Sequence, residues 1–285
     1  MTEIELDLTE RAYNPVTAID ESSATGQTAQ IFADIRAVMQ IPLVTSIWRG
    51  LQGIEDSLPA AWTQTKLIYA SGLPARCLHS VVTQTALSQA DRGTDVDWTS
   101  AAGGPSELSA ALTIIDAYNR SNGLNFLTLM ALLVEPSAER PEALKEDAVS
   151  WPPLRALYAR SDISDHDWSL VQSVNGLGTA GPSDQVATLW RHLAHWPELL
   201  RVIARAMSPL HESGAISSAA TRAISHAHRE ARDLAHWRGS MLSLPPLASK
   251  TVHGYVTNPA HVARMVVIGH FLANSIRQQQ GLAHP

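Results

Sequence analysis

Two histidines and one aspartate stand close together in the sequence and could act as a base. His192 and His195 are three residues apart in LWRHLAHWPELL (residues 189–200), a spacing that puts both on one helix face. A histidine titrates near neutral pH and can accept a proton from a nucleophile. Asp184, in the preceding GPSD, is a carboxylate alternative. Each of these residues also has a non-catalytic interpretation. The histidines could be packed or solvent-facing, and Ser183-Asp184 could cap a helix.

A second polar group lies in YNRSNGLNFL (residues 118–127). The amide of Asn122 can both donate and accept hydrogen bonds, so it could orient a water molecule or a substrate carbonyl. Tyr118 and Asn125 could line the same pocket. The alternative role for Asn122 is the N-cap of a helix, a position that Asn favours. Tyr118 and Asn125 suit a helix junction equally well.

Arg49 and Arg191 each follow a tryptophan and could bind a carboxylate through two hydrogen bonds. A conformational or surface role is the interpretation that we favour for both. His226 and His228 do not predict a metal site, because residues two apart on a helix point about 200° away from each other. The sequence predicts neither a metal nor another cofactor.

Composition excludes several classes of function. The net charge is -6 and Lys66, Lys145 and Lys250 are the only lysines, which argues against nucleic acid as a partner. The single cysteine, Cys77, excludes an internal disulfide and a CxxC redox pair. The acidic start MTEIELDLTE is no signal peptide, and the apolar run FLTLMALLV is too short to cross a membrane. We expect a cytoplasmic protein with a small-molecule substrate; a homodimer or a partner protein stays open.

The elements that position these residues are all expected to be helices. Apolar residues recur at helical spacing, and no window alternates in the manner of a strand. A polar segment with prolines, EPSAERPEALKEDAVSWPP, predicts a linker. Helices are expected over residues 23–40, 43–57, 59–70, the eighties, 107–118, from about 122, from about 164, and over 186–195, 197–208, 216–238 and 259–277.

The chain also shows signs of an internal repeat. Trp48-Arg49 aligns with Trp190-Arg191 at an offset of 142 residues, and Asn122 aligns with Asn258 at an offset of 136. Recurring core residues at helical spacing are the alternative. We predict a first repeat over residues 1–134, a linker over 135–153 and a second repeat over 154–285, with the site between the repeats.

Three segments resemble the group I 2-haloacid dehalogenase (DehI-like) family. IFADIRAVMQIPLVTSIWRGL resembles its start, LWRHLAHWPELL its second-half counterpart, and YNRSNGLNFL its Phe-Asn-x-x-Asn segment. The resemblance covers most of the chain in order. It implies an all-α, AhpD-like fold of two related halves with the site between them. The peroxidases of that fold use a CxxC pair, which this chain lacks.

The resemblance also implies a reaction, in which a carboxylate in the second half activates water and an Asn in the first half holds it. Asn122 matches the Asn. The Ser-Asp pair of the family falls on Thr188-Leu189, and leucine cannot accept a proton. Two aromatic positions of the family's pocket fall on Leu43 and Ser46. The fold is therefore matched better than the chemistry.

Three functions stay open on these grounds. The first is an enzyme that displaces or eliminates a leaving group at a saturated carbon, with ring closure by a nucleophile within the substrate as a form that needs no water-activating Asp. The second is a hydrolytic 2-haloacid dehalogenase with Asp184 as a displaced base. The third is a non-catalytic member that binds a ligand or partner between the repeats.

Overall fold

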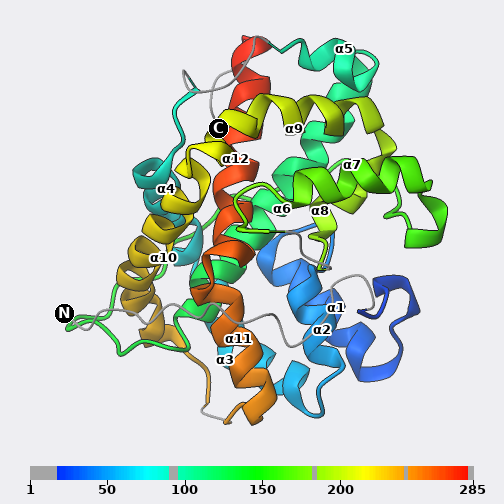
Figure 1. Ribbon diagram of the computed structural model, residues 1–285. Coiled ribbons are helices and arrows are strands. Elements are labelled where there is room, and N and C mark those ends of the chain that lie inside the picture. Colours follow the sequence, from blue (N-terminus) through cyan, green and yellow to red (C-terminus); the bar gives the residue numbers. More distant parts are fainter. Residues whose placement is uncertain (1–17, 90–95, 182–184, 241–242, 282–285) are drawn as a thin grey trace.

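The computed structural model describes residues 18–89, 96–181, 185–240 and 243–281 (Figure 1). Within these residues the chain forms helices and no strand, which confirms the predicted all-α class. The α-helices are α1 (Gly26–Met39), α2 (Ser46–Gln52), α3 (Ser57–Ala70), α4 (Leu73–Thr85), α5 (Trp98–Ala102), α6 (Pro105–Met130), α7 (Asp165–Asn175), α8 (Thr188–His192), α9 (Pro197–Glu212), α10 (Ala215–Leu234), α11 (Pro246–Thr257) and α12 (Arg264–Gln279).

Helix α6 is one continuous helix, where the sequence predicted two that meet near Asn122. It begins at Pro105, in the first turn where proline is tolerated, and runs to Met130. Gly123 in its interior costs about 1 kcal/mol relative to alanine. Its lack of a side chain lets Leu78 of α4 pack directly against the helix, since a Cβ there would overlap the Leu78 methyl groups. Burial around most of its circumference keeps the helix intact.

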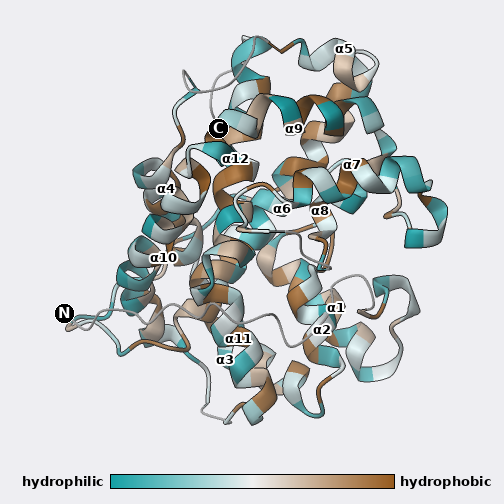
Figure 2. Ribbon diagram, in the orientation of Figure 1, coloured by the Kyte–Doolittle hydropathy of each residue, from teal (hydrophilic) through white to brown (hydrophobic). Residues whose placement is uncertain are grey.

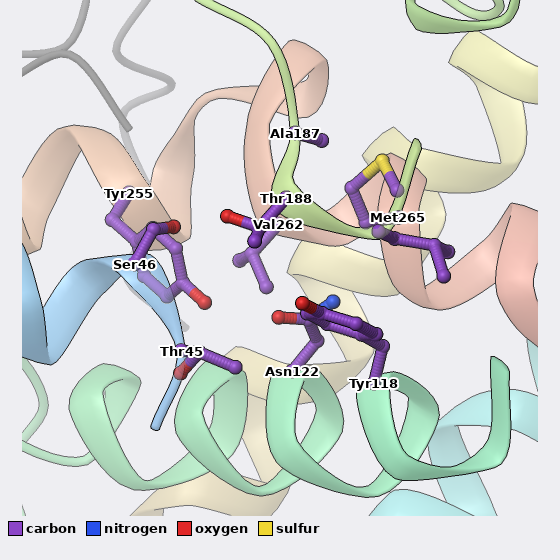
Figure 3. A pocket seen from close by; sticks show the side chains of 10 residues that line it. Thr45, Ser46, Tyr118, Asn122, Ala187, Thr188, Tyr255, Val262 and Met265 are labelled. Carbon is purple, nitrogen blue, oxygen red and sulfur yellow. The ribbon is translucent and has the colours of Figure 1, made fainter. Parts of the chain in front are cut away.

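Helices α11 and α12 are separated by a kink, where the sequence predicted one helix over residues 259–277 and none before it. Pro259–Ala263 form a short π-helical segment in which His261 leaves helical geometry, with φ -103° and ψ -125°. The Asn258 side chain accepts a hydrogen bond of 2.9 Å from the Ala260 backbone N–H, so it caps this segment. The kink turns Val262 and Met265 toward the interior between the helices (Figure 3).

The apolar side chains form two clusters that share helices. The first is built by α1–α4, α10, α11 and the end of α6, and the second by α5, α7–α9, the start of α6 and most of α12. Helices α6 and α12 pass through both clusters, and Figure 2 shows brown apolar residues along α12. These two helices therefore join the clusters into one body.

The predicted linker region forms no helix. The chain runs over residues 134–159 without regular structure, and is held to the first cluster by hydrogen bonds from Leu144 N to Ser71 O (2.7 Å) and from Val149 N to Gln40 Oε1 (2.7 Å). An ion pair of 2.7 Å joins Arg120 on α6 to Glu146. The division of the chain into two repeats stays a prediction.

Candidate active site

A small pocket opens between α2, α6, α8 and the α11–α12 kink. Both halves of the chain line it (Figure 3). The lining is a mixture of hydroxyls, one amide and apolar groups, which is typical of a small-molecule site. It consists of Thr45, Ser46, Tyr118, Asn122, Ala187, Thr188, Leu189, Tyr255, Val262 and Met265.

Tyr118 and Asn122 enter the pocket from α6. They are four residues apart, so they share one face of that helix, and Figure 3 shows both side chains pointing up from it. Asn122 lies in the middle of α6, so the alternative of a helix N-cap is wrong for this residue. Asn258 does cap a helical segment. The two asparagines that the repeat aligns therefore have different roles.

Five of the candidate residues meet in this pocket: Ser46, Tyr118, Asn122, Thr188 and Leu189. Leu43 does not line it; its side chain is partly buried against the second cluster. Leu189, where the resemblance places the catalytic Asp, is buried at the pocket wall. Asp184 lies outside the described residues.

Asn125 supports the pocket from behind instead of lining it. It is fully buried, and its Oδ1 accepts hydrogen bonds from Trp48 Nε1 (2.9 Å) and Tyr69 Oη (2.8 Å). Its Nδ2 donates to Thr45 Oγ1 (2.7 Å). The amide thus fixes the start of α2, from which Thr45 and Ser46 reach the pocket.

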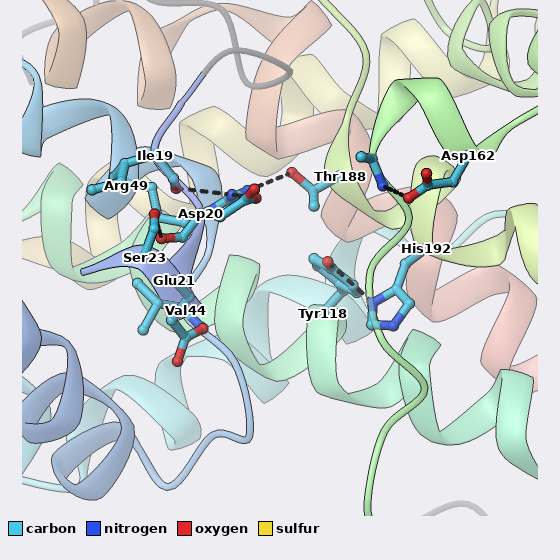
Figure 4. A network of polar contacts seen from close by, with 11 residues as sticks. Ile19, Asp20, Glu21, Ser23, Val44, Arg49, Tyr118, Asp162, Thr188 and His192 are labelled. Atoms are coloured by element: carbon cyan, nitrogen blue, oxygen red, sulfur yellow. Dashed lines mark hydrogen bonds and ion pairs between the residues drawn. The ribbon is translucent and has the colours of Figure 1, made fainter.

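His192 is connected to the pocket through Tyr118 (Figure 4). Its Nε2 lies 2.7 Å from the Arg155 carbonyl oxygen, which can only accept, so Nε2 carries the proton. In the neutral ring Nδ1 is then an acceptor, and the Tyr118 hydroxyl lies 3.4 Å from it. The two rings meet edge to face, with their centroids 5.8 Å apart. The oxygen of Tyr118 is left with lone pairs for a second partner.

Burial sets the charge state of this pair. It lowers the pKa of His192 to about 4; the hydrogen bond to the Arg155 carbonyl opposes this shift, and the neighbouring His195 and Arg191 add to it. Burial raises the pKa of Tyr118 above its usual value, although Arg49 and Arg191 act against this. Both side chains are therefore neutral at pH 7.

Arg49 and Arg191 are buried, so of the conformational or surface role favoured for them the surface part is wrong. Only 3% of Arg49 and 4% of Arg191 is exposed. Arg49 Nη2 lies 3.4 Å from Thr188 Oγ1, and its Nη1 donates to the Ile19 carbonyl at 3.2 Å. These contacts join α2 of the first half to α8 of the second (Figure 4).

Sequence reasoning missed half of the lining. Thr45 and Ala187 were missed although each is the direct neighbour of a predicted residue, Ser46 and Thr188 respectively. Tyr255, Val262 and Met265 come from the segment that the repeat aligns with residues 118–130. That alignment was the available signal, since a site between repeats must take residues from both copies.

The described part of the chain contains no group of three or more His, Cys, Asp or Glu side chains placed to hold a metal ion. None of its helices is both long and apolar enough to cross a membrane.

Solved structures of similar shape are D-2-haloacid dehalogenases. A mutant in complex with D-2-CPA superposes with a TM-score of 0.71 at 12% identity, covering 98% of this chain and 100% of the other. A second mutant gives 0.70 at 13% identity, and a complex with L-LA gives 0.69 at 13% identity, each covering 99% of this chain and 100% of the other. No family model and no curated protein matches the sequence. The chain therefore has the all-helical fold of the D-2-haloacid dehalogenases.

Proposed function

We propose that this protein is a dehalogenase-like enzyme that displaces a leaving group from a saturated carbon of a small substrate. The observation that carries the proposal is the contact of 3.4 Å between the Tyr118 hydroxyl, at the pocket wall, and His192 Nδ1. It supplies a base in a pocket whose wall has Leu189 where the resemblance places the Asp.

In the proposed step the nucleophile gives its proton to the Tyr118 oxygen while Tyr118 passes its own proton to His192 Nδ1. The nucleophile forms its bond to carbon as the leaving group departs on the opposite side with the bonding electron pair. His192 becomes an imidazolium, still hydrogen-bonded through Nε2 to Arg155. With a pKa of about 4, His192 has the basicity of an ordinary aspartate, close to 3.9.

Asn122 and Thr188 orient the reacting groups in this mechanism. Both line the pocket, on opposite sides in Figure 3, and both can donate or accept hydrogen bonds. Asn122 and Thr188 are therefore suited to hold the nucleophile close to the carbon that it attacks. Holding the two reacting atoms in this geometry lowers the barrier of the reaction.

We propose that the nucleophile is an amine or hydroxyl of the substrate itself, so that the product is a small ring. An internal nucleophile reacts without a strong base because its attack is intramolecular. An internal nucleophile agrees with the presence of Leu189, because a leucine side chain cannot activate water at that position.

A hydrolytic 2-haloacid dehalogenase is the second candidate, favoured by the likeness of fold to D-2-haloacid dehalogenases. Asp184 would then be the base. A third is a member without catalysis that binds a ligand in the same pocket.

Isotope labelling separates these candidates. The enzyme is incubated in ¹⁸O-water with 2-chloropropionate and, separately, with 2-amino-3-chloropropionate, and halide and products are measured. Ring closure releases chloride from the second compound without ¹⁸O in the product and depends on His192. Labelled lactate from the first, lost in Asp184→Asn but kept in His192→Asn, establishes the hydrolytic candidate instead. No halide from either compound, together with saturable binding, favours the non-catalytic candidate.

A further inference from the structure

A second tyrosine lines the pocket and faces Tyr118. Tyr255 comes from α11, near the end of that helix, whereas Tyr118 comes from α6. Both are buried, with 3% of each residue exposed. Figure 3 shows the two phenol hydroxyls pointing toward each other across the pocket, Tyr255 from the left and Tyr118 from the right. The two phenols therefore reach a bound ligand from opposite sides.

This arrangement has the geometry that a displacement at carbon requires. The nucleophile approaches the carbon from the side opposite the leaving group, so a base and a group that receives the leaving group are needed on opposite sides. In the proposed mechanism the base is reached through Tyr118, whose hydroxyl lies 3.4 Å from His192 Nδ1. A leaving group that departs away from Tyr118 moves toward Tyr255.

Tyr255 has the chemistry to hold a departing anion. A phenol carries one proton and two lone pairs, so it can accept a hydrogen bond from a neighbour and still donate its own proton to a ligand. Ser46 adds a second hydroxyl from α2, which packs against α11. In Figure 3 Ser46 lies on the same side of the pocket as Tyr255. The side away from Tyr118 thus offers two O–H donors.

The apolar part of the lining increases the weight of these donors. Leu189, Val262 and Met265 line the pocket with side chains that cannot stabilise a negative charge. In such surroundings a hydrogen bond to an anion is stronger than in water. A donor placed where charge develops in the transition state lowers the barrier, and removing one typically lowers kcat by about 10²- to 10³-fold.

We propose that Tyr255 is a further catalytic residue, which donates a hydrogen bond to the leaving group, with Ser46 as a second donor. The inference rests on the proposed function, since only a displacement releases an anion in the pocket. As the bond between carbon and the leaving group breaks, its electron pair stays with the leaving group. Tyr255 keeps its proton throughout, so the step ends with a negative charge on the anion and a positive charge on His192.

A comparison of two leaving groups tests this role. The wild type and its variants are given 2-amino-3-chloropropionate and 2-amino-3-bromopropionate, and halide release is measured. Chloride is the poorer leaving group and the stronger hydrogen-bond acceptor, so it depends more on a donor. Tyr255→Phe is expected to lower kcat about 10²-fold for the chloro compound and at least about fivefold less for the bromo compound. Ser46→Ala should show the same preference with a smaller loss.

Two other variants show what the kinetic result means. Tyr118→Phe, which removes the path to the base, should lower kcat by a similar factor for both compounds. Tyr158→Phe, whose ring stacks on His195 outside the pocket, should leave both rates within about twofold of the wild type. Equal losses for the two compounds in Tyr255→Phe, with turnover by the wild type, overturn the role of Tyr255 and leave the proposed function standing.

The anion site is also measured without turnover. The ³⁵Cl NMR line of sodium chloride broadens when chloride exchanges with a protein site. This broadening should fall in Tyr255→Phe and stay unchanged in Tyr158→Phe. In crystals of the wild type soaked with sodium bromide, anomalous scattering should locate bromide within hydrogen-bond distance of the Tyr255 hydroxyl.

These measurements separate a failure of the inference from a failure of the proposed function. Bromide at Tyr255 without turnover of either compound supports the anion site and counts against the proposed function alone. No bromide at Tyr255, or chloride broadening that is the same in Tyr255→Phe and the wild type, overturns the inference.

Discussion

His192 shows how burial, more than residue type, determines chemistry at this site. A solvated histidine is half protonated near pH 6.5, whereas His192 stays neutral to about pH 4. The sequence allowed His192 to be proposed as a base from its residue type and its place in LWRHLAHWPELL. Its partners could not be predicted, because Tyr118 and the Arg155 carbonyl are 74 and 37 residues away in the chain.

Removing either member of the pair is expected to remove most of the activity. Tyr118→Phe and His192→Asn should each lower kcat by about 10²- to 10⁴-fold, the usual contribution of a general base. Tyr158→Phe is the matched control, since that ring stacks on His195 at 3.9 Å and lies outside the pocket. Steady-state halide release measures all three. A kcat of Tyr118→Phe within twofold of the wild type would rule out the relay.

The lowered pKa of His192 also makes stability depend on pH. Between pH 6.5 and 4 the unfolded chain binds a proton at this histidine and the folded chain does not, so the free energy of unfolding falls as the pH falls. The shift to about 4 corresponds to a loss on the order of 3 kcal/mol. Urea unfolding at pH 7 and pH 4 should show this loss in the wild type and less of it in His192→Asn.

Burial of His270 on α12 lowers its pKa as well, so some loss of stability persists in His192→Asn. The informative quantity is the difference between the two proteins across this pH range. Parallel pH profiles would mean that the pKa of His192 is not depressed in the folded state.

At the scale of the elements, the sequence predicted where helices form. It did not predict where a helix continues or kinks. The strongly periodic segments, such as those of α1, α9 and α10, were expected close to their observed bounds. The continuity of α6 through Gly123 was missed because it depends on Leu78 of another helix. The kink before α12 was missed because the proline of Asn258-Pro259 equally suits the first turn of a helix.

The contact between α6 and α12 depends on Gly269. A Cβ at this position would overlap the amide oxygen of Asn119 on α6, so in Gly269→Ala the buried Asn119 side chain or the helix that carries it must shift. We expect a loss of about 1–3 kcal/mol in the free energy of unfolding, as for other overpacked sites. Gly53→Ala, whose new methyl group would meet only the Gly50 carbonyl oxygen at 3.4 Å, serves as the control. Chemical denaturation of both variants checks this, and equal stabilities would contradict it.

At the scale of the whole molecule, the two apolar clusters depend on shared helices. Sequence reasoning placed the site between two halves, and the pocket takes Thr45 and Asn122 from one and Thr188 and Tyr255 from the other. The complete set of pocket residues could not be predicted, because the sequence does not reveal which turn of α11 or α12 faces α6.

Because α6 and α12 run through both clusters, we expect the protein to unfold in a single transition. Neither cluster can keep its apolar surface buried once these helices separate. Helix content by circular dichroism and tryptophan fluorescence should give the same urea midpoint. Two separated midpoints would show that the clusters unfold independently.

The Arg155 carbonyl that fixes the proton on His192 Nε2 belongs to the main chain. Every amino acid carries such a carbonyl, so substitution at position 155 leaves the acceptor in place. An insertion or deletion between α6 and α7 would instead move the carbonyl along the segment and out of reach. For the tautomer of His192, the length of this segment therefore matters more than the side chain at position 155.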